Sequence, residues 1–511
     1  MVYSPSLTDI AAAAAIVWIF SRLMKKQALP YPPGPPGKPI IGNASDIPKT
    51  AKQQWEKFTQ WKEDYGPIIH ISAMGIHFVV LNDVNVAKDL LEKRSAIYSD
   101  RPTMPMAGEL CGWDRPLVMH HYDDTFKEFR RSFFKLFGTR QNLERFYPLF
   151  EVHGQKLMAR LIAKPDQVSD MLRKCAGSII LKIAYGYDVA QEGKDPVIDV
   201  VDDGMRQLDV LLSAQWLVDL MPFLKGVPEW FPGASFKQTV KAYRKTLDTM
   251  ADLPFTMIKK KMREGTAEHC FVSSQLSESD VTPEKEYTIK WAATSIYGGG
   301  ADTTVSAMHT FILSMTLNPD VQRKAQAEVD AVVGRDRFPT LADRPHLPYV
   351  EAVFKETLRW QPIAPLAIPH SLMQDDVYNN YLIPKGALVI PNIWAMANDP
   401  TNYKNPRKFD PERFVASPGH VPELDPHDLV FGFGRRVCPG TNLADATVWL
   451  EIAMSLAVLN FSKARDADGR EITPKGEYTE ANVTHPVNFP LSIKPRDAQA
   501  EALIQAGAGT D

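Results

Sequence analysis

The strongest pattern near the start of the chain is an unbroken apolar run at residues 10–20. A helix that crosses a bilayer needs about 20 apolar residues, so this run is at the short limit for a membrane span. Three cations follow the run and none precedes it: Arg22, Lys25 and Lys26. The positive-inside rule then predicts a single-pass anchor at residues 1–28, with the rest of the chain in the cytosol. A buried core helix is the alternative, and a cleaved signal peptide fits less well because such peptides begin with positive charge.

Prolines dominate the next segment, PYPPGPPGKP at residues 30–39. Proline has no backbone N–H and also restricts the residue before it, so this segment cannot be helical. The sequence therefore predicts a stiff, extended hinge at residues 29–40 between the anchor and a folded body at residues 41–511.

The folded body is predicted to be mainly α with small β-sheets. Alternating apolar and polar residues at 68–74 and 77–81 predict a β-hairpin. Apolar positions three and four apart predict helices over most of residues 84–360. A second β region is expected at residues 377–390, with a turn at 384–386. No internal repeat and no clear second domain is evident, and the helical pattern is interrupted at three places: residues 102–116, 222–233 and 273–285.

Composition narrows the class of protein. The chain has 511 residues, 44% hydrophobic and 23% charged, which is ordinary globular composition and allows a core large enough to enclose a cofactor. The net charge of −3 gives no electrostatic basis for nucleic-acid binding. The four cysteines show no CxxC spacing, so neither a zinc site nor a disulfide framework is expected, and a reducing compartment fits: Cys111, Cys175, Cys270 and Cys438.

One of these cysteines has unusual surroundings. Cys438 lies in FGFGRRVCPG at residues 431–440, among glycines and cations. The glycines allow close backbone approach to a flat cofactor, and Arg435 and Arg436 can neutralise anionic groups. An apolar helix is expected from about residue 440, so Cys438 would precede a helix N-terminus, where a thiolate is favoured. The alternative is a buried structural cysteine beside a glycine-rich turn.

This segment matches FxxGxRxCxG, the haem-ligand loop of the cytochrome P450 family. All the specified positions are present: Phe431, Gly434, Arg436, Cys438 and Gly440. The resemblance implies the P450 fold and haem b with the Cys438 thiolate as iron ligand, which promotes O–O cleavage. It covers nearly the whole chain and is closest to fungal microsomal members, among them basidiomycete proteins likened to O-methylsterigmatocystin oxidoreductase.

Two further motifs precede the cysteine in the order that the family shows. Glu356 and Arg359 form ExxR in a predicted helix, and the segment 409–414 resembles the family's later aromatic-rich motif. The resemblance implies a Glu356–Arg359–Arg413 cluster that braces the haem-binding core. A surface ion pair is the plainer interpretation of an isolated ExxR.

The segment GGGADTT at residues 298–304 lies inside a long apolar helical pattern from about residue 290 to residue 317. Three glycines cost such a helix roughly 1 kcal/mol each, which indicates close packing or a local distortion. The segment matches the family's oxygen-binding motif (A/G)GxDT. The resemblance implies that Thr303 stabilises the activated oxygen and that Asp302 helps to deliver protons, although an Asp–Thr pair in a helix is otherwise unremarkable.

Haem propionates need cationic partners. The resemblance offers Arg436, His370 and Arg130, the last from the family's WxxxR motif. The tryptophan of that motif is Phe126 here, which lacks an N–H donor. Three nearby residues are candidate substitutes: His120, His121 and Lys127. His370 is equally well interpreted as an ordinary loop histidine.

Three functions are compatible with these motifs. The first is monooxygenation of an apolar substrate by O2, with electrons from a separate NADPH–cytochrome P450 reductase, since the chain has no dinucleotide fingerprint. Cytochrome b5 is a second candidate donor, and the anchor places the enzyme on the endoplasmic reticulum membrane, facing the cytosol. The second is isomerisation or dehydration without O2, against which Asp302 and Thr303 argue. The third is a non-enzymatic haem protein or sensor.

The substrate pocket implied by the resemblance is formed by five segments: residues 104–113, 208–216, 297–301, 363–368 and 478–483. Their Met, Leu, Ile, Ala and Trp content predicts a small apolar substrate. A terpenoid or an aromatic secondary metabolite is expected, and repeated oxidation at one carbon is compatible with the same pocket.

Overall fold

The computed structural model describes residues 29–190, 193–213 and 216–509. The anchor predicted at residues 1–28 lies outside this part of the chain. Within it, none of the helices combines the length and the apolar character that a bilayer span requires. The proline-rich segment at 30–37 contains no helix, as predicted, and it runs beside the small sheet, because the carbonyl of Pro33 accepts from the N–H of His70 at 2.9 Å.

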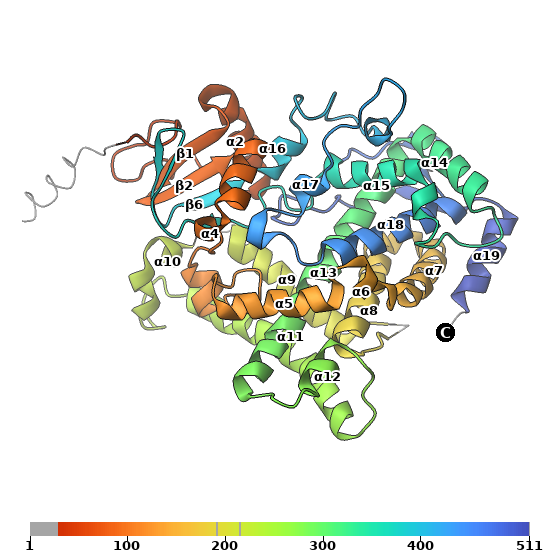
Figure 1. Ribbon diagram of the computed structural model, residues 1–511, viewed down its shortest axis with the longest axis horizontal. Helices are drawn as coiled ribbons and strands as arrows, with labels where there is room; N and C mark the ends of the chain where they lie inside the picture. Colours follow the sequence, from red (N-terminus) through yellow and green to blue (C-terminus); the bar gives the residue numbers. More distant parts are fainter. Residues whose placement is uncertain (1–28, 191–192, 214–215, 510–511) are drawn as a thin grey trace, which may run out of the picture.

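A four-stranded sheet with α2 (Ala51–Tyr65) lies at one end of the molecule (Figure 1). Its order is β1-β2-β6-β3, with β1 and β2 antiparallel and β6 parallel to β2. The predicted hairpin is confirmed, because β1 and β2 pair in antiparallel order. The turn between them is formed by Met74 and Gly75, both with positive φ. The strands are β1 (Ile68–Ala73), β2 (Ile76–Leu81), β3 (His370–Ser371) and β6 (Leu388–Pro391).

The second predicted β region divides between two sheets. Strands β4 (Asp376–Tyr378) and β5 (Tyr381–Ile383) form a separate hairpin. Its turn is at Asn379 and Asn380, which both adopt the left-handed conformation that asparagine tolerates. The turn predicted at 384–386 exists, but it leads from β5 into β6 of the other sheet rather than closing a hairpin.

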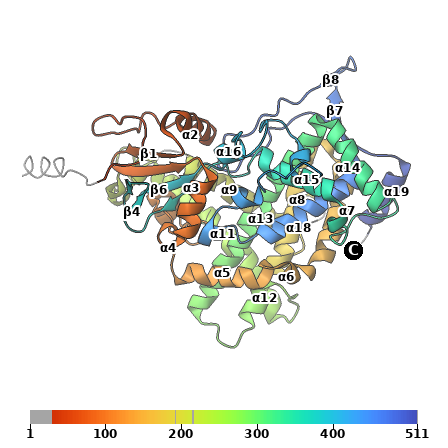
Figure 2. The same cartoon turned by 45° about the horizontal axis from the view of Figure 1, so that its top comes forward.

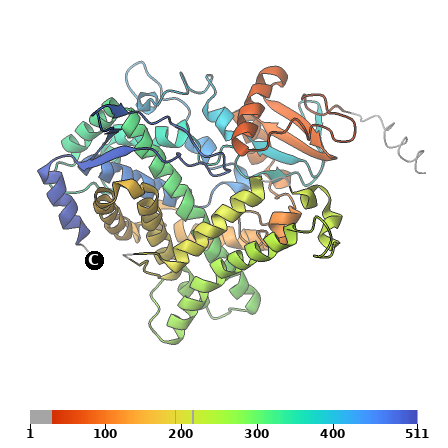
Figure 3. The ribbon, with the colours of Figure 1, turned by 180° about the vertical axis from the view of Figure 1, so that it is seen from behind.

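Helices make up the rest of the body, and α13 (Pro283–Leu317) runs through its middle (Figures 1 and 2). α8 and α18 pack directly against α13. Figure 3 shows α9 and α11 running side by side on the opposite face of the molecule. The remaining helices have these bounds: α3 Val84–Ala87, α4 Ser95–Tyr98, α5 Asp124–Phe137, α6 Arg140–Glu144, α7 Tyr147–Ala163, α8 Val168–Tyr185, α9 Pro196–Ser213, α10 Leu217–Leu220, α11 Phe236–Arg263, α12 Phe271–Leu276, α14 Pro319–Val332, α15 Pro348–Trp360, α16 Ile393–Ala397, α17 His427–Val430, α18 Thr441–Val458 and α19 Ala498–Ala508.

The central helix begins earlier than the sequence predicts. Its N-cap is Thr282, whose hydroxyl accepts from the N–H of Lys285, and Pro283 occupies the first helical position. The residues in the first turns of α13 are polar and largely exposed to solvent. The apolar pattern in the sequence therefore begins only near residue 290. The polar tract at 273–285 was predicted to interrupt the helical pattern throughout. In the structure α12 occupies its first residues and α13 its last, so the interruption is shorter.

The predicted helix after the cysteine loop is α18, which begins at Thr441 and is buried along most of its length. It leads into a three-stranded sheet of order β8-β7-β9 (Figure 2), which the sequence did not predict. These strands are β7 (Leu459–Arg465), β8 (Glu471–Ile472) and β9 (Leu491–Pro495). The other two predicted breaks contain short helical turns, of π type at Pro105–Leu110 and of 3₁₀ type at Pro222–Gly226.

Candidate active site

A cavity of about 1080 Å³ lies between α13 and the cysteine loop. On the loop side its wall includes Phe431, Gly432, Cys438 and Gly440, and on the α13 side Gly299, Gly300, Asp302 and Thr303. Each of the five segments predicted to form the substrate pocket contributes to the wall, the first of them through Trp113 alone. The two predicted motifs therefore face each other across one space large enough for a cofactor and a substrate.

The cysteine loop is folded tightly onto the protein. The N–H of Cys438 donates to the carbonyl of Phe431 at 2.7 Å. Gly434 has φ +57°, and a Cβ there would lie 2.0 Å from the carbonyl oxygen of Leu91, so only glycine fits. A Cβ at Gly440 would be 3.8 Å from the Cys438 sulfur. The backbone thus holds the thiol at the cavity wall.

The protonation of Cys438 depends on what occupies the cavity. Burial raises the pKa of its thiol, and the Gly440 N–H, Arg130 and the Thr441 hydroxyl only partly oppose that effect. A raised pKa keeps the thiol protonated at neutral pH unless a cation stabilises the thiolate. An iron ion next to the sulfur supplies such a charge, so the site fits a haem with thiolate ligation.

Three arginines gather at the cavity and bond only to carbonyl groups. Arg436 donates to Ser99 and His120, both at 2.7 Å. Arg101 donates to three carbonyls at 2.7–3.0 Å, those of Val118, Ile368 and Pro369. Arg130 donates to Val437 at 2.5 Å. Within the described residues, no carboxylate forms an ion pair with any of the three.

The positive charges of these arginines also repel one another, which contributes to the lowered pKa values of Arg101 and Arg436. Burial and the charge of Arg436 lower the pKa of Arg101 well below its usual range. Burial, together with Arg130, lowers the pKa of Arg436 to about 10, although Asp100 opposes the shift. Buried cations that lack an anion are costly, and two propionates would supply the missing negative charge. The residues present therefore fit haem b.

The predicted propionate partners Arg130, His370 and Arg436 all line the cavity. His370 is buried, and its Nδ1 bonds to the carbonyl of Tyr98 at 2.7 Å. Burial and the nearby arginines lower the pKa of His370 to about 3, so its imidazole is neutral. Arg101 was missed by the sequence analysis because it belongs to no motif, and its burial is evident only in the fold.

Phe126 stands where the family has tryptophan, and its ring contacts an arginine of the cavity. The guanidinium carbon of Arg436 lies 3.8 Å from the centre of its ring, a cation–π contact. The candidate substitutes do not line the cavity. Instead they lie near carboxylates: Lys127 with Asp124, His121 with Asp100 and His120 with Asp123. Phe126 thus orients an arginine rather than donating a hydrogen bond.

The three glycines of α13 have two different roles. A Cβ at Gly300 would lie 2.8 Å from Ile180, and one at Gly298 would lie 3.1 Å from Met250, so both serve close helix packing. A Cβ at Gly299 would meet nothing within 4 Å. Gly299 also lines the cavity, and its carbonyl accepts from the Thr303 hydroxyl at 2.8 Å. The predicted close packing is therefore present at Gly298 and Gly300, whereas Gly299 leaves open space at the cavity wall.

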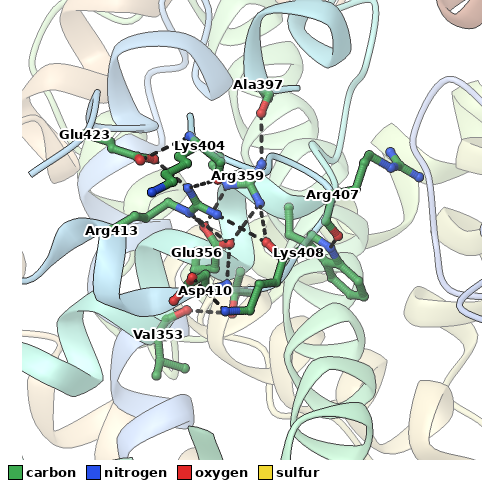
Figure 4. Close-up of polar contacts among 12 residues, drawn as sticks. Val353, Glu356, Arg359, Ala397, Lys404, Arg407, Lys408, Asp410, Arg413 and Glu423 are labelled. Atoms are coloured by element: carbon green, nitrogen blue, oxygen red, sulfur yellow. Dashed lines mark hydrogen bonds and ion pairs between the residues drawn. The ribbon is translucent and has the colours of Figure 1, made fainter. Parts of the chain in front are cut away.

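The structure brings Glu356, Arg359 and Arg413 together (Figure 4). Arg359 donates to both carboxylate oxygens of Glu356 at 2.7 and 2.8 Å, and Arg413 lies 3.2 Å from the same carboxylate. Glu356 and Arg359 are fully buried, so this is not a surface ion pair. Burial raises the pKa of Glu356 in spite of both arginines. The N–H of Asp410 adds a further bond at 2.8 Å, which ties the following loop to the cluster.

A second charged cluster was not predicted. His427 lies between Asp425 at 2.8 Å and Asp445 at 3.1 Å, and its ring stacks on Phe431 with centroids 5.4 Å apart. Burial opposes the charged imidazole, but the bonds to the two aspartates raise the pKa of His427 to about 9. His427 is therefore charged at neutral pH and holds the start of the cysteine loop to α18. No spacing rule in the sequence identifies it.

Comparison with known proteins agrees with this geometry. The family model of cytochrome P450 matches residues 32–490, so the chain belongs to the cytochrome P450 family. Cytochrome P450 monooxygenase 208 of Postia placenta is 47% identical over 96% of this chain and 95% of its own length. Cytochrome P450 monooxygenase claR of Ampulloclitocybe clavipes is 44% identical over 98% and 93%. The protein is thus a P450 monooxygenase with a haem-thiolate cofactor.

A solved structure supports the fold alone. The zebrafish cytochrome P450 with abiraterone superimposes with a TM-score of 0.68 at 24% identity, covering 87% of this chain and all of that one. The mainly helical P450 fold with small sheets is therefore confirmed.

Replacing Arg101 by glutamine should weaken haem binding. A charge-assisted hydrogen bond contributes about 1.5–3 kcal/mol, so haem should leave the variant roughly ten to a hundred times faster. Transfer of haem to excess apomyoglobin measures this rate. Arg435→Gln is the matched control, because its side chain is exposed and bonds to Tyr122. Equal rates in both variants would contradict a role of Arg101 in holding the propionates.

Replacing His427 by glutamine should lower thermal stability in a pH-dependent way. Its pKa is about 9 in the folded protein, above the ordinary value of 6.5. The stabilisation, roughly 3 kcal/mol, is therefore complete below pH 6.5 and is lost as the pH rises through 9. Calorimetry should show a larger drop in Tm at pH 6 than at pH 9.5. His269→Gln, at an exposed histidine, should show no such difference.

Proposed function

We propose that this P450 monooxygenase inserts one oxygen atom of O2 into a small apolar substrate, with Cys438 as the ligand of the haem iron. The reaction would be the hydroxylation of a terpenoid or an aromatic secondary metabolite. The observation that carries the proposal is the single cavity that joins the Cys438 thiol to Asp302 and Thr303. A place among the O-methylsterigmatocystin oxidoreductase-like members is part of the same proposal.

The residues of the chain divide the work between binding and proton supply. Haem supplies the activation of O2 when it is bound. Arg101, Arg130 and Arg436 would hold its propionates, while Phe431, Gly434 and Gly440 shape the loop against it. His370 would join the arginines, because the negative charge of a propionate favours a proton on its Nε2. Thr303 presents a hydroxyl at the open face of α13, and Asp302 would pass protons toward it. The buried Glu356–Arg359–Arg413 cluster would brace the core behind the loop.

The cavity wall supports an apolar substrate. Away from the arginines it is lined mainly by apolar side chains of the predicted segments, among them Trp113, Leu208, Ile363, Ile368 and Val483. Burial of apolar surface would drive binding, and the open space at Gly299 would admit the carbon that is oxidised.

The proposal extends to location and partners. Residues 1–28 would anchor the enzyme in the endoplasmic reticulum membrane, residues 29–40 would form the hinge, and residues 41–511 would face the cytosol. Four exposed apolar side chains near α10 would add a second membrane contact: Leu217, Phe223, Trp230 and Phe231. Electrons would come from NADPH–cytochrome P450 reductase, with cytochrome b5 as a second donor, at the surface nearest Cys438.

The ligand assignment is tested by the carbon monoxide difference spectrum of the reduced protein. The wild type should give the strongly red-shifted Soret band of thiolate ligation, and Cys438→Ser should lose both this band and turnover. Cys270→Ser is the control, because serine can take over the capping bond that Cys270 makes to the N–H of Ser273. A red-shifted band in Cys438→Ser would refute the assignment.

Membrane attachment is tested by removing residues 1–28 and sedimenting the expressed protein with microsomes. Most of the truncated protein should move to the soluble fraction, since the predicted anchor is gone. The remainder should be released by adding Trp230→Ser and Phe231→Ser, which remove exposed aromatic surface. Full retention of the truncated protein with these two substitutions would contradict both proposed contacts.

A further inference from the structure

Asp302 is held by two basic side chains from distant parts of the chain. Nη1 of Arg173, on α8, lies 3.1 Å from one carboxylate oxygen. Nε2 of His485, in the segment between β8 and β9, lies 3.2 Å from the other. All three side chains are mostly buried, and all three line the cavity. The pairing therefore belongs to the active site and not to the surface.

The position of His485 is fixed by its own backbone. Its N–H donates to the Thr479 hydroxyl at 3.0 Å, and the Thr479 N–H donates to its carbonyl at 2.8 Å. The preceding residue, Thr484, accepts a hydrogen bond from Ser306 of α13 at 2.5 Å. The imidazole is thus attached to the same helix that carries Asp302, which keeps the two side chains in register.

The surrounding charges define the protonation of Asp302. Burial alone would raise its pKa, but the hydrogen bond and charge of His485, together with Arg173, lower it below the ordinary value. Asp302 is then a carboxylate at neutral pH, and it must receive a proton before it can pass one on. A group in contact with the Asp302 carboxylate has to supply that proton.

Two other titratable groups face the pair. Asp202, on α9, lies 3.5 Å from Arg173, and burial raises its pKa to about 6, with Arg173 opposing and Asp302 reinforcing the shift. His309 lies on α13, and burial and the charges of His485 and Arg173 lower its pKa to about 4. Neither forms an ion pair or hydrogen bond with Asp302 among the contacts of the described residues. Two basic side chains do contact Asp302, and they differ in chemistry: a guanidinium keeps its proton, whereas an imidazole ring can both accept and donate one.

We propose that His485 is the residue that positions Asp302 and supplies it with protons. The proton on Nε2 of the imidazolium moves to the bound carboxylate oxygen of Asp302, which leaves a neutral imidazole and a carboxylic acid. A solvent proton delivered by water in the cavity then restores the imidazolium, so each turn of the relay moves one proton. Two turns supply the two protons that insertion of one oxygen atom and release of the other as water consume, and the relay itself transfers no electrons. Arg173 holds the second oxygen throughout. The inference rests on the proposed role of Asp302 and Thr303 in the reaction.

The test uses the full-length enzyme reconstituted with its reductase, NADPH and O2 alone. In His485→Gln the side-chain amide keeps a hydrogen bond to Asp302 but carries no transferable proton. NADPH oxidation should slow about threefold or more, the solvent isotope effect should increase, and peroxide released per NADPH should rise toward the level of Thr303→Ala. The wild-type rate should fall with pH across the range in which imidazoles titrate, and this dependence should be absent in the variant.

Infrared difference spectra of the resting protein give a readout that does not depend on turnover. The carboxylic acid band that Asp302→Asn removes should persist to higher pH in His485→Gln, because loss of the imidazolium raises the pKa of Asp302. Arg173→Gln should shift this band as well, yet it should retain the pH dependence of NADPH oxidation. His309→Gln should match the wild type in both measurements.

Two outcomes would overturn the inference. One is an unchanged pH dependence and isotope effect in His485→Gln, and the other is an identical loss in Arg173→Gln, which would make charge alone responsible. If His485→Gln fails to fold, His485→Asn is measured against the same expectations. The carbon monoxide spectrum is recorded first for each variant. A missing thiolate band in the wild type would refute the proposed ligand, whereas a normal band with unchanged proton kinetics would refute only the role of His485.

Discussion

A guanidinium removed from water must meet a negative partner, and this constraint organises both the core and the active site. In the core, fully buried Arg359 is satisfied by fully buried Glu356. At the cavity, Arg101 is also buried, but its hydrogen bonds go to carbonyl oxygens, and the attraction of Asp100 does not outweigh burial and the repulsion of Arg436. The chain supplies the first counter-charge itself and leaves the second to an anionic cofactor. Haem binding is then coupled to the stability of the folded enzyme.

Helix α15 connects the two halves of this arrangement. Arg359 binds the end of α16 through the carbonyl of Ala397, and Glu356 binds the following segment through the N–H of Asp410. Directly before Glu356 on the same helix, Lys355 lies 2.6 Å from Asp425, whose carboxylate also binds His427. His427 continues the chain of charges to Asp445, in the first turns of α18. The cysteine loop is thus braced from both ends by one helix, so its geometry depends on ion pairs that never touch the cavity.

The sequence predicts the parts of this enzyme that depend on local spacing. The hairpin and the two long helices follow from periodicity and glycine placement. The structure brings the glycine-rich motif of α13 and the cysteine loop to one cavity, while Glu356 and Arg359 lie in the core. Arg101, His427 and His485 could not be found in this way, because the role of each depends on a partner between 18 and 267 positions away. The C-terminal sheet was missed for a related reason, since β8 has two residues and pairs only at the edge of β7.

The two faces of the cavity differ in how freely their charges can change. On the cysteine side, His427 is fixed between two carboxylates that keep its pKa near 9, so its charge is constant over the physiological range. On the α13 side, Asp302 shares its carboxylate between Arg173 and His485, the residue proposed to supply it with protons. A constant field suits the side proposed to hold the thiolate and to receive electrons, because a fluctuating charge there would alter the potential of the iron. A variable charge suits the side proposed to deliver protons. In the proposed mechanism the two tasks thus fall to different basic side chains: a histidine fixed between two carboxylates on the cysteine side, and an arginine and a histidine that share one carboxylate on the α13 side.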